Sequence, residues 1–248
     1  MATRRELMII GGATALWLGG IRALPHLRDR LAGFTFVDLV QPEGFRALSS
    51  GRGTPATGGY FDITTGLDPA DPFPPGLLES IESEPATFLF NDLSAKATPV
   101  AYFFDYYCPY CRIVSDHLDN LVSTSEISLT HHHWPIFGEA SVLAARAVLA
   151  AGIWGDAEPL HNRLKEARVR VTLPYLETLA DSLELPWPDI ARSMHTPAVT
   201  AVLDRTRALA RLFGIVGTPA LVVGRTLVEG QIAEARLKAL VRLEKRET

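Results

Sequence analysis

The sequence predicts an α/β fold in which a block of helices separates two groups of strands. Three observations support this prediction. An apolar run typical of a buried strand leads into helical periodicity and a second strand, a long stretch of helical pattern follows, and a hairpin signal with a terminal helix closes the chain. We therefore expect a strand-helix-strand unit, a helical insertion and a strand-strand-helix unit.

The composition of the 248 residues narrows the function classes. Hydrophobic residues make up 47% of the chain and charged residues 21%, which excludes a disordered protein. The formal net charge is -4 and no long basic run occurs, which argues against nucleic acid as a partner. Two cysteines in a chain of this length exclude a disulfide-dense scaffold.

Residues 1–24 are expected to be a targeting segment rather than part of the folded domain. Arg4 and Arg5 precede an uncharged, mostly apolar run over 7–21, which is short for a membrane span. The arginine pair with Leu7 resembles a twin-arginine export signal. An uncleaved membrane tether and a buried N-terminal helix are the alternatives, and the expected location is the periplasm, with or without anchoring.

Residues 25–96 are expected to form a lightly structured extension. Short strand-like pieces occur at Phe34–Val37 and Tyr60–Ile63, separated by a stretch rich in glycine, serine and threonine. Prolines over 68–75 prevent a continuous helix there. A short helix is expected over 76–83.

Residues 97–137 predict the first half of the α/β domain. The apolar run Thr98–Phe104 is typical of a strand buried on both faces. Apolar residues then recur at three- and four-residue steps, which predicts a helix from Cys108 to Ser123. The alternation over Glu126–His131 predicts a second strand.

The helical insertion is expected over 138–213 and the second half of the α/β domain over 214–248. The helices of the insertion are expected at 141–151, 158–167, 174–183 and 199–213. Two strands flanking Gly224 and Arg225 predict a hairpin, followed by a helix over 232–243.

Both cysteines fall in one motif, Cys108-Pro109-Tyr110-Cys111, at the predicted start of a helix. Free backbone N–H groups and the positive end of the helix dipole favour a thiolate on Cys108, which predicts that this residue is the nucleophile. Cys111 lies one turn further in and suits the role of resolving a mixed disulfide. Pro109 is compatible with the first helical turn. The pair therefore predicts thiol-disulfide exchange.

Two segments resemble the DsbA-like branch of the thioredoxin-fold family. The segment 104–112, which contains the cysteine motif, is similar to the family's active-site segment, and Val216-Gly217-Thr218-Pro219-Ala220-Leu221 resembles its cis-proline loop. The segment 134–141 is similar to the junction that precedes the family's helical insertion. The resemblance spans roughly residues 99–241.

The resemblance implies a thioredoxin-like fold with an inserted helical domain and an exported protein thiol-disulfide oxidoreductase. By the same resemblance, Gly217, Thr218 and Pro219 would bind substrate beside Cys108, with Tyr110 completing the redox motif. Unfolded or disulfide-containing proteins would be the substrates, and a membrane protein would reoxidise or reduce the pair. No organic cofactor is expected.

Departures from the family pattern leave the direction of electron flow open. Tyr110 stands where strongly oxidising members carry histidine, and Tyr102 stands where some members carry an acidic residue. Asp105 is the nearest carboxylate. It is expected either to relay protons or to act as a turn residue before the helix.

Two other readings start from different residues. His131 and His133 share one face of the predicted strand and, with the cysteines, could supply four ligands to zinc or copper in an exported thiol chaperone without turnover. Three histidines at a strand end are also typical of a solvated edge. In the third reading the chain is a tethered assembly factor whose functional part is the extension over 33–96.

Overall fold

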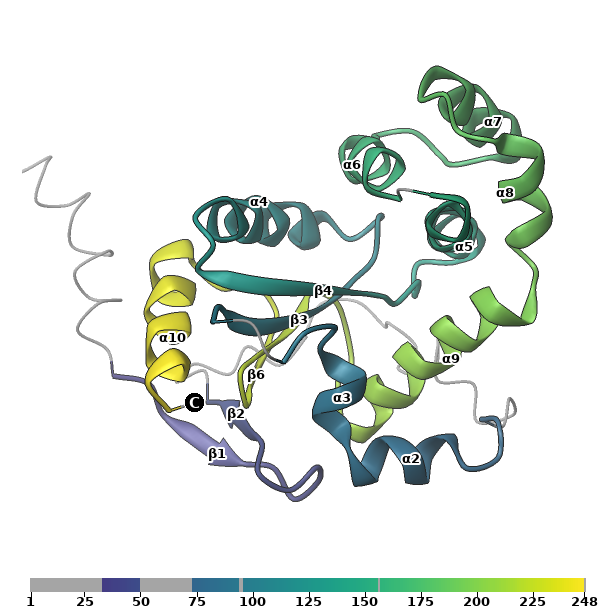
Figure 1. Cartoon of the computed structure of the whole chain (residues 1–248). Coiled ribbons are helices and arrows are strands. Elements are labelled where there is room, and N and C mark those ends of the chain that lie inside the picture. The colour runs from purple at the N-terminus through teal and green to yellow at the C-terminus, as the bar shows by residue number, and fades with distance from the viewer. Residues whose placement is uncertain (1–32, 50–72, 94–95, 156, 248) are drawn as a thin grey trace, which may run out of the picture.

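The computed structural model describes residues 33–49, 73–93, 96–155 and 157–247 (Figure 1). The targeting segment predicted for 1–24 and the strand predicted at Tyr60–Ile63 lie outside the described residues. Among the helices that are described, none has the length and apolar character required to cross a bilayer.

A six-stranded sheet has the order β1-β2-β6-β5-β3-β4. Strands β3 and β4 are parallel, β5 runs antiparallel to both β3 and β6, and β2 is parallel to β6. The strands are β1 (Phe36–Asp38), β2 (Arg46–Leu48), β3 (Thr98–Phe104), β4 (Ile127–His133), β5 (Ala220–Val223) and β6 (Thr226–Glu229). The predicted α/β fold and the predicted hairpin are confirmed.

Helices lie on both faces of this sheet (Figure 1). The helices outside the insertion are α2 (Leu77–Ser83), α3 (Pro85–Leu89), α4 (Pro109–Ser123) and α10 (Glu234–Glu247). Helix α4 connects the parallel strands β3 and β4, as expected for a βαβ unit.

Strand β3 divides its side chains between two hydrophobic cores because successive residues of a strand point to opposite faces. Val100, Tyr102 and Phe104 pack in the core that contains α4, α10 and the inserted helices. Ala101 and Phe103 pack in the core beneath α2, α3 and the second half of α9. All five are buried, which confirms the prediction of a strand covered on both faces.

The insertion contains the expected helices and one that was not predicted. Its members are α5 (Glu139–Trp154), α6 (Glu158–Glu166), α7 (Leu173–Ser182), α8 (Trp187–Ser193) and α9 (Pro197–Leu212). Helix α8 was missed because Pro186 and Pro188 suggested a break. They occupy the N-cap and the first turn, where proline costs no helical hydrogen bond.

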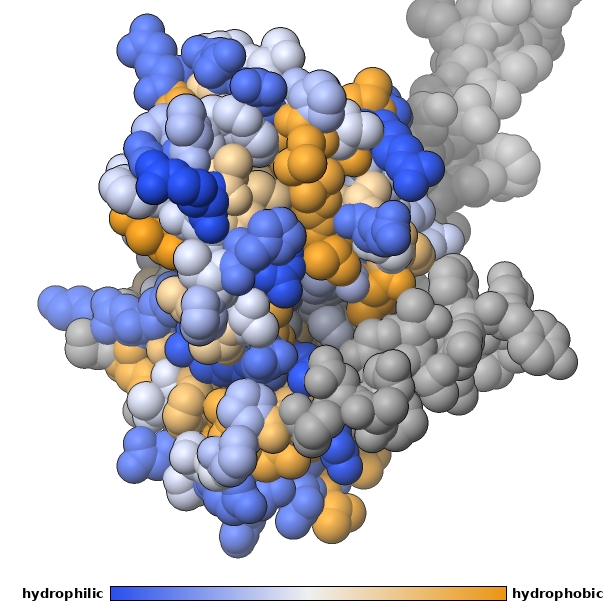
Figure 2. Space-filling view, turned by 90° about the vertical axis from the view of Figure 1, so that its right-hand side faces the viewer, coloured by the Kyte–Doolittle hydropathy of each residue, from blue (hydrophilic) through white to orange (hydrophobic). Residues whose placement is uncertain are grey.

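Hydrophobic and hydrophilic residues are mixed on the surface that includes the helices of the insertion. Figure 2 shows hydrophobic residues reaching the surface in small groups between hydrophilic ones. Exposed apolar side chains in the insertion include Ile153, Trp154 and Leu173. Single exposed apolar residues are normal on protein surfaces and indicate no partner by themselves.

The extension is not lightly structured over 36–48, contrary to the prediction. Strands β1 and β2 pair with each other, and β2 joins the sheet beside β6. Arg46 is buried and its Nη2 lies 2.7 Å from Oε1 of Glu244, while its Nε donates to Thr226 Oγ1 at 2.9 Å. A charge buried this deeply requires a partner, and Glu244 near the C-terminus supplies it.

Candidate active site

The cysteine motif lies where β3 ends and α4 begins. Cys108 has an extended backbone and is the N-cap of α4, and Pro109 is the first helical residue. The backbone N–H of Cys108 donates to the carbonyl of Asp105 at 3.1 Å, which closes the turn between strand and helix. Both cysteines are free and buried: Cys108 is 1% exposed and Cys111 is 2% exposed.

The loop before β5 brings Thr218 to Cys108 across the sheet. Ala220 pairs with Phe103 near the end of β3, so the residues before Ala220 lie beside the turn that carries the cysteines. The Thr218–Pro219 peptide bond is cis. The Cys108 thiol donates to the Thr218 carbonyl oxygen at 3.3 Å. Gly217 is partly exposed in the same loop, and its neighbour Val216 is 61% exposed.

The pKa values of the two thiols are shifted in opposite directions. Hydrogen bonding by the Cys111 thiol, more than any other cause, lowers the pKa of Cys108 from 9.0 to about 6, with burial opposing the change. The Thr218 hydroxyl has no partner among the described residues while Cys108 is a thiol, and its hydrogen bond to the thiolate lowers this pKa further. Burial, followed by hydrogen bonding and charge on Cys108, raises the pKa of Cys111 far above its ordinary value.

This asymmetry suits sequential chemistry. Cys108 ionises first, and the helix N-terminus with its free N–H groups stabilises the resulting charge. Cys111 remains a neutral thiol until Cys108 is bound elsewhere, because two thiolates cannot occupy the same buried site.

Tyr102 contacts the cysteine pair from β3. Its hydroxyl donates to the backbone carbonyl of Cys111 at 2.8 Å and lies 3.3 Å from the Ser115 hydroxyl. Burial raises the pKa of Tyr102, so the residue stays neutral. Tyr102 therefore places a neutral hydrogen-bond donor beside Cys111.

The Asp105 carboxylate accepts four hydrogen bonds. Its Oδ1 accepts from the backbone N–H of Tyr107 at 2.7 Å and from the Ser141 hydroxyl at 2.8 Å. Its Oδ2 accepts from the backbone N–H groups of Ile136 and Phe137 at 2.7 and 3.1 Å. Burial raises the pKa of Asp105 and these four donors oppose the change. The carboxylate thus joins the active-site turn to the junction between β4 and α5.

The three histidines of β4 are not a solvated edge, contrary to one reading of the sequence. His132 and His133 are buried, and only His131 is exposed. The His132 ring lies against Phe103, and its Nε2 is 2.9 Å from the Leu89 carbonyl oxygen. The strand is covered here by α3 on one face and by α6 on the other.

His131 and His133 do share a face, and His161 of α6 lies on it, with ring centroids 4.6 and 6.2 Å away. His161 Nδ1 is 2.8 Å from the Tyr106 hydroxyl. No set of three or more His, Cys, Asp or Glu side chains among the described residues is arranged to hold a metal ion. The metal-chaperone alternative is not supported.

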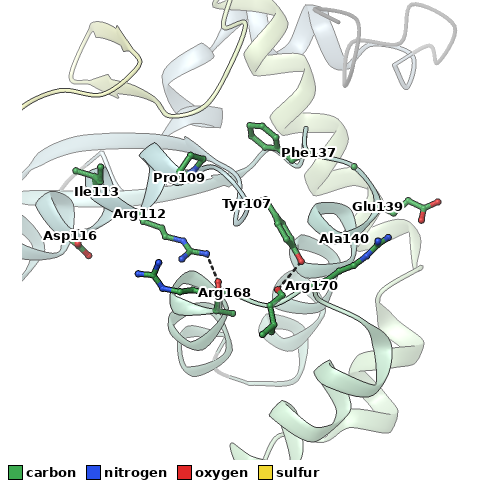
Figure 3. A pocket seen from close by; sticks show the side chains of 13 residues that line it. Tyr107, Pro109, Arg112, Ile113, Asp116, Phe137, Glu139, Ala140, Arg168 and Arg170 are labelled. Carbon is green, nitrogen blue, oxygen red and sulfur yellow. Dashed lines mark hydrogen bonds between the residues drawn. The ribbon is translucent and has the colours of Figure 1, made fainter. Parts of the chain in front are cut away.

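A cavity of about 970 Å³ opens beside the cysteine motif (Figure 3). Pro109 and Tyr107, the two chain neighbours of Cys108, line it, together with Ile113, Phe137 and Val169. Tyr106 is core packing, whereas Tyr107 reaches this cavity, so the aromatic residues before Cys108 have different roles. Tyr110 lies outside the cavity lining and is 56% exposed.

The sequence analysis did not assign Arg168 and Arg170, which also line this cavity. They alternate with Val169 and Val171 in the connection between α6 and α7. This alternation of arginine and valine is the one local pattern in the sequence that could have drawn attention to the connection. It does not identify a binding site, because nothing in the local sequence indicates that the connection contacts the start of α4.

The comparisons with known proteins identify the family to which the chain belongs. Residues 99–242 match the family model described as a DSBA-like thioredoxin domain. The chain belongs to this family. Its thioredoxin-like fold and the predicted resemblance to DsbA-like thiol-disulfide oxidoreductases are thereby confirmed. No curated protein matches the chain.

Solved structures of similar fold include three bacterial proteins. A thioredoxin-like oxidoreductase from Silicibacter pomeroyi DSS-3 is 34% identical with a TM-score of 0.60, and the match covers 65% of this chain and 98% of that one. A periplasmic thioredoxin-like protein from Salmonella enterica serovar Typhimurium is 27% identical with a TM-score of 0.54, covering 64% and 95%. The thiol-disulfide exchange protein alpha-DsbA2 from Wolbachia pipientis, 21% identical with a TM-score of 0.58 and covering 67% and 95%, shows the fold alone.

Proposed function

We propose that the protein exchanges disulfides with protein substrates through Cys108 and Cys111. The observation that carries this proposal is the placement of a low-pKa Cys108 thiol at a helix N-terminus, hydrogen-bonded to Thr218 and with Cys111 buried behind it. A passive local disulfide would not require the thiol to face a separate loop with a cis-proline bond.

In the oxidising direction a substrate thiolate attacks Sγ of Cys108 in the Cys108–Cys111 disulfide. The new sulfur–sulfur bond joins substrate to Cys108, and the bond to Cys111 breaks, leaving a thiolate that takes up a proton because of its high pKa. A second substrate thiolate then attacks the first substrate sulfur and releases Cys108 as a thiolate. The substrate loses two electrons and the cysteine pair gains them.

The reverse direction reduces a substrate disulfide by attack of the Cys108 thiolate, followed by attack of Cys111 on Cys108. The lowered pKa of Cys108 favours the oxidising direction, because it stabilises the reduced enzyme and makes Cys108 the better leaving group. Gly217, Thr218 and Pro219 would present the loop against which substrate lies. Asp105 would position the turn.

Two variants test the roles of the sulfurs. Cys108→Ser should abolish exchange, and Cys111→Ser should accumulate a mixed disulfide with substrate, detected on a non-reducing gel. Normal turnover by Cys111→Ser would show that the roles are wrong. Equilibration of the wild-type pair with glutathione gives the direction: a potential near roughly −120 mV means a disulfide donor, whereas roughly −270 mV means a reductant.

We also propose that the protein is exported to the periplasm, where a membrane protein renews the oxidation state of the pair. Support comes from the arginine pair before the apolar run at 7–21 and from the neighbour described as periplasmic. Fractionation of cells producing the full chain tests the proposal. Replacing Arg4 and Arg5 by lysine should retain the protein in the cytoplasm if the signal is of the twin-arginine type.

A further inference from the structure

The cavity beside Cys108 is formed by parts of the chain that are distant in sequence. The start of α4, the junction between β4 and α5, and the connection between α6 and α7 each contribute to its lining (Figure 3). At about 970 Å³ it is large enough for several side chains of a bound peptide. It lies beside the redox pair, since Tyr107 and Pro109 line it.

Residues that flank the redox pair hold the α6–α7 connection in place. The Tyr107 hydroxyl accepts a hydrogen bond from the Val171 N–H at 2.6 Å and donates to the Val169 carbonyl at 3.4 Å. The Arg112 guanidinium donates to the Ala167 carbonyl. The part of the connection that carries Arg168 and Arg170 is therefore fixed at the cavity by the neighbours of Cys108 and Cys111.

The cavity has a basic margin in a protein of net negative charge. Arg112, Arg168 and Arg170 line it, against two carboxylates, Asp116 and Glu139, while the whole chain carries a formal net charge of -4. Arg168 and Arg170 are exposed, and in Figure 3 they extend from the connection to either side of Tyr107. Guanidinium groups at such positions bind carboxylates in two-point contacts.

Apolar side chains supply the rest of the lining. Ile113, Phe137 and Val169 are each at least one-third exposed, so they offer apolar area that the fold itself does not cover. A surface that combines exposed apolar side chains with guanidinium groups suits an extended peptide with acidic side chains better than a small anion.

We propose that this cavity binds the segment of a protein substrate that flanks its reactive cysteine, and that it selects segments carrying aspartate or glutamate. The inference rests on the proposed function, because it names the class of substrate that reaches Cys108. Arg168 and Arg170 are the selecting residues. The apolar lining holds the segment irrespective of its charge.

The test uses the full chain and two cysteine peptides that differ only in having glutamate or glutamine beside the cysteine. The second-order rate constant of exchange should be about 5-fold higher for the glutamate peptide at low ionic strength, as expected for two exposed charge contacts. This ratio should fall towards 1 at high salt. In Arg168→Gln/Arg170→Gln the ratio should fall towards 1 at low salt, because the rate for the glutamate peptide should fall more than the rate for the glutamine peptide.

A matched control separates local contacts from net charge. Arg192→Gln/Arg211→Gln removes the same charge from exposed positions outside the cavity lining and should preserve the preference. Equal rates for both peptides with the wild type, or a preference that survives substitution of Arg168 and Arg170, would overturn the inference. Failure of every peptide to form a mixed disulfide would instead overturn the proposed function, which the rate of the glutamine peptide reports separately.

Discussion

Replacement of Thr218 by valine tests how the fold sets the acidity of Cys108. The side chain keeps its shape and the backbone carbonyl still accepts from the thiol, but the hydroxyl that donates to the thiolate is lost. A hydrogen bond to a charged group contributes about 1.5 kcal/mol, which corresponds to about one pKa unit. The pKa of Cys108 should therefore rise from about 6 towards about 7.

The same change has a redox consequence. Because the folded-state pKa of Cys108 is lowered from 9.0, its ionisation stabilises the reduced protein at high pH, and this contribution is lost as pH falls through about 6. At pH 7 the contribution is about 1.4 kcal/mol in the wild type and about 0.4 kcal/mol in the variant. The difference makes the variant about 20 mV more reducing.

Thiolate absorbance of the reduced protein, followed against pH, measures the first quantity, since the high pKa of Cys111 removes it from the titration range. Equilibration with glutathione measures the second. Thr178→Val, an exposed position on α7 whose hydroxyl donates to Pro174, is the matched control and should change neither. An unchanged midpoint in a folded Thr218→Val protein would refute the role of the hydroxyl.

The remaining predictions concern two buried charged groups. Asp105→Asn should lower the free energy of unfolding by about 2–4 kcal/mol in urea titrations, because the new amide NH2 group faces at least one backbone N–H whichever way it is turned. A variant of normal stability with slow exchange would instead favour proton relay. Arg46→Met should lower the free energy of unfolding by about 3–5 kcal/mol, since it removes the ion pair with the buried Glu244 carboxylate and leaves that negative charge without the compensating guanidinium. Adding Glu244→Leu should restore part of the loss, and a single-variant cost below about 1 kcal/mol would contradict the pairing.

The elements around the cysteine pair could be predicted because their signals are local. The apolar run of β3 and the periodicity of α4 each occupy adjacent residues, and the resemblance of the segment around Pro219 located the opposing loop. Even the missed helix α8 had a local cause, since prolines compatible with a first turn were interpreted as a break.

The features that escaped prediction depend on partners far away in the chain. The strand-like piece expected at Phe34–Val37 overlaps β1, but β2 has only three residues, too few for a periodic pattern, and the burial of Arg46 depends on Glu244, 198 residues later. His133 looked solvated because only the fold places α6 and His161 over its strand. The alternation of β4 predicted which histidines share a face but not what covers that face.

The insertion has a part in the active site that neither half of the α/β domain explains. Asp105 joins the turn before Cys108 to the N–H groups that lead into α5, and Tyr107 and Arg112 hold the connection after α6. Because these contacts lie on both sides of the cysteine motif, a shift of the insertion relative to the sheet would have to break them or move the N-terminus of α4. The position of that N-terminus contributes to the stabilisation of the Cys108 thiolate, together with the Cys111 thiol that α4 carries. The inserted helices therefore help to set the chemistry of the pair as well as the surface offered to its substrates.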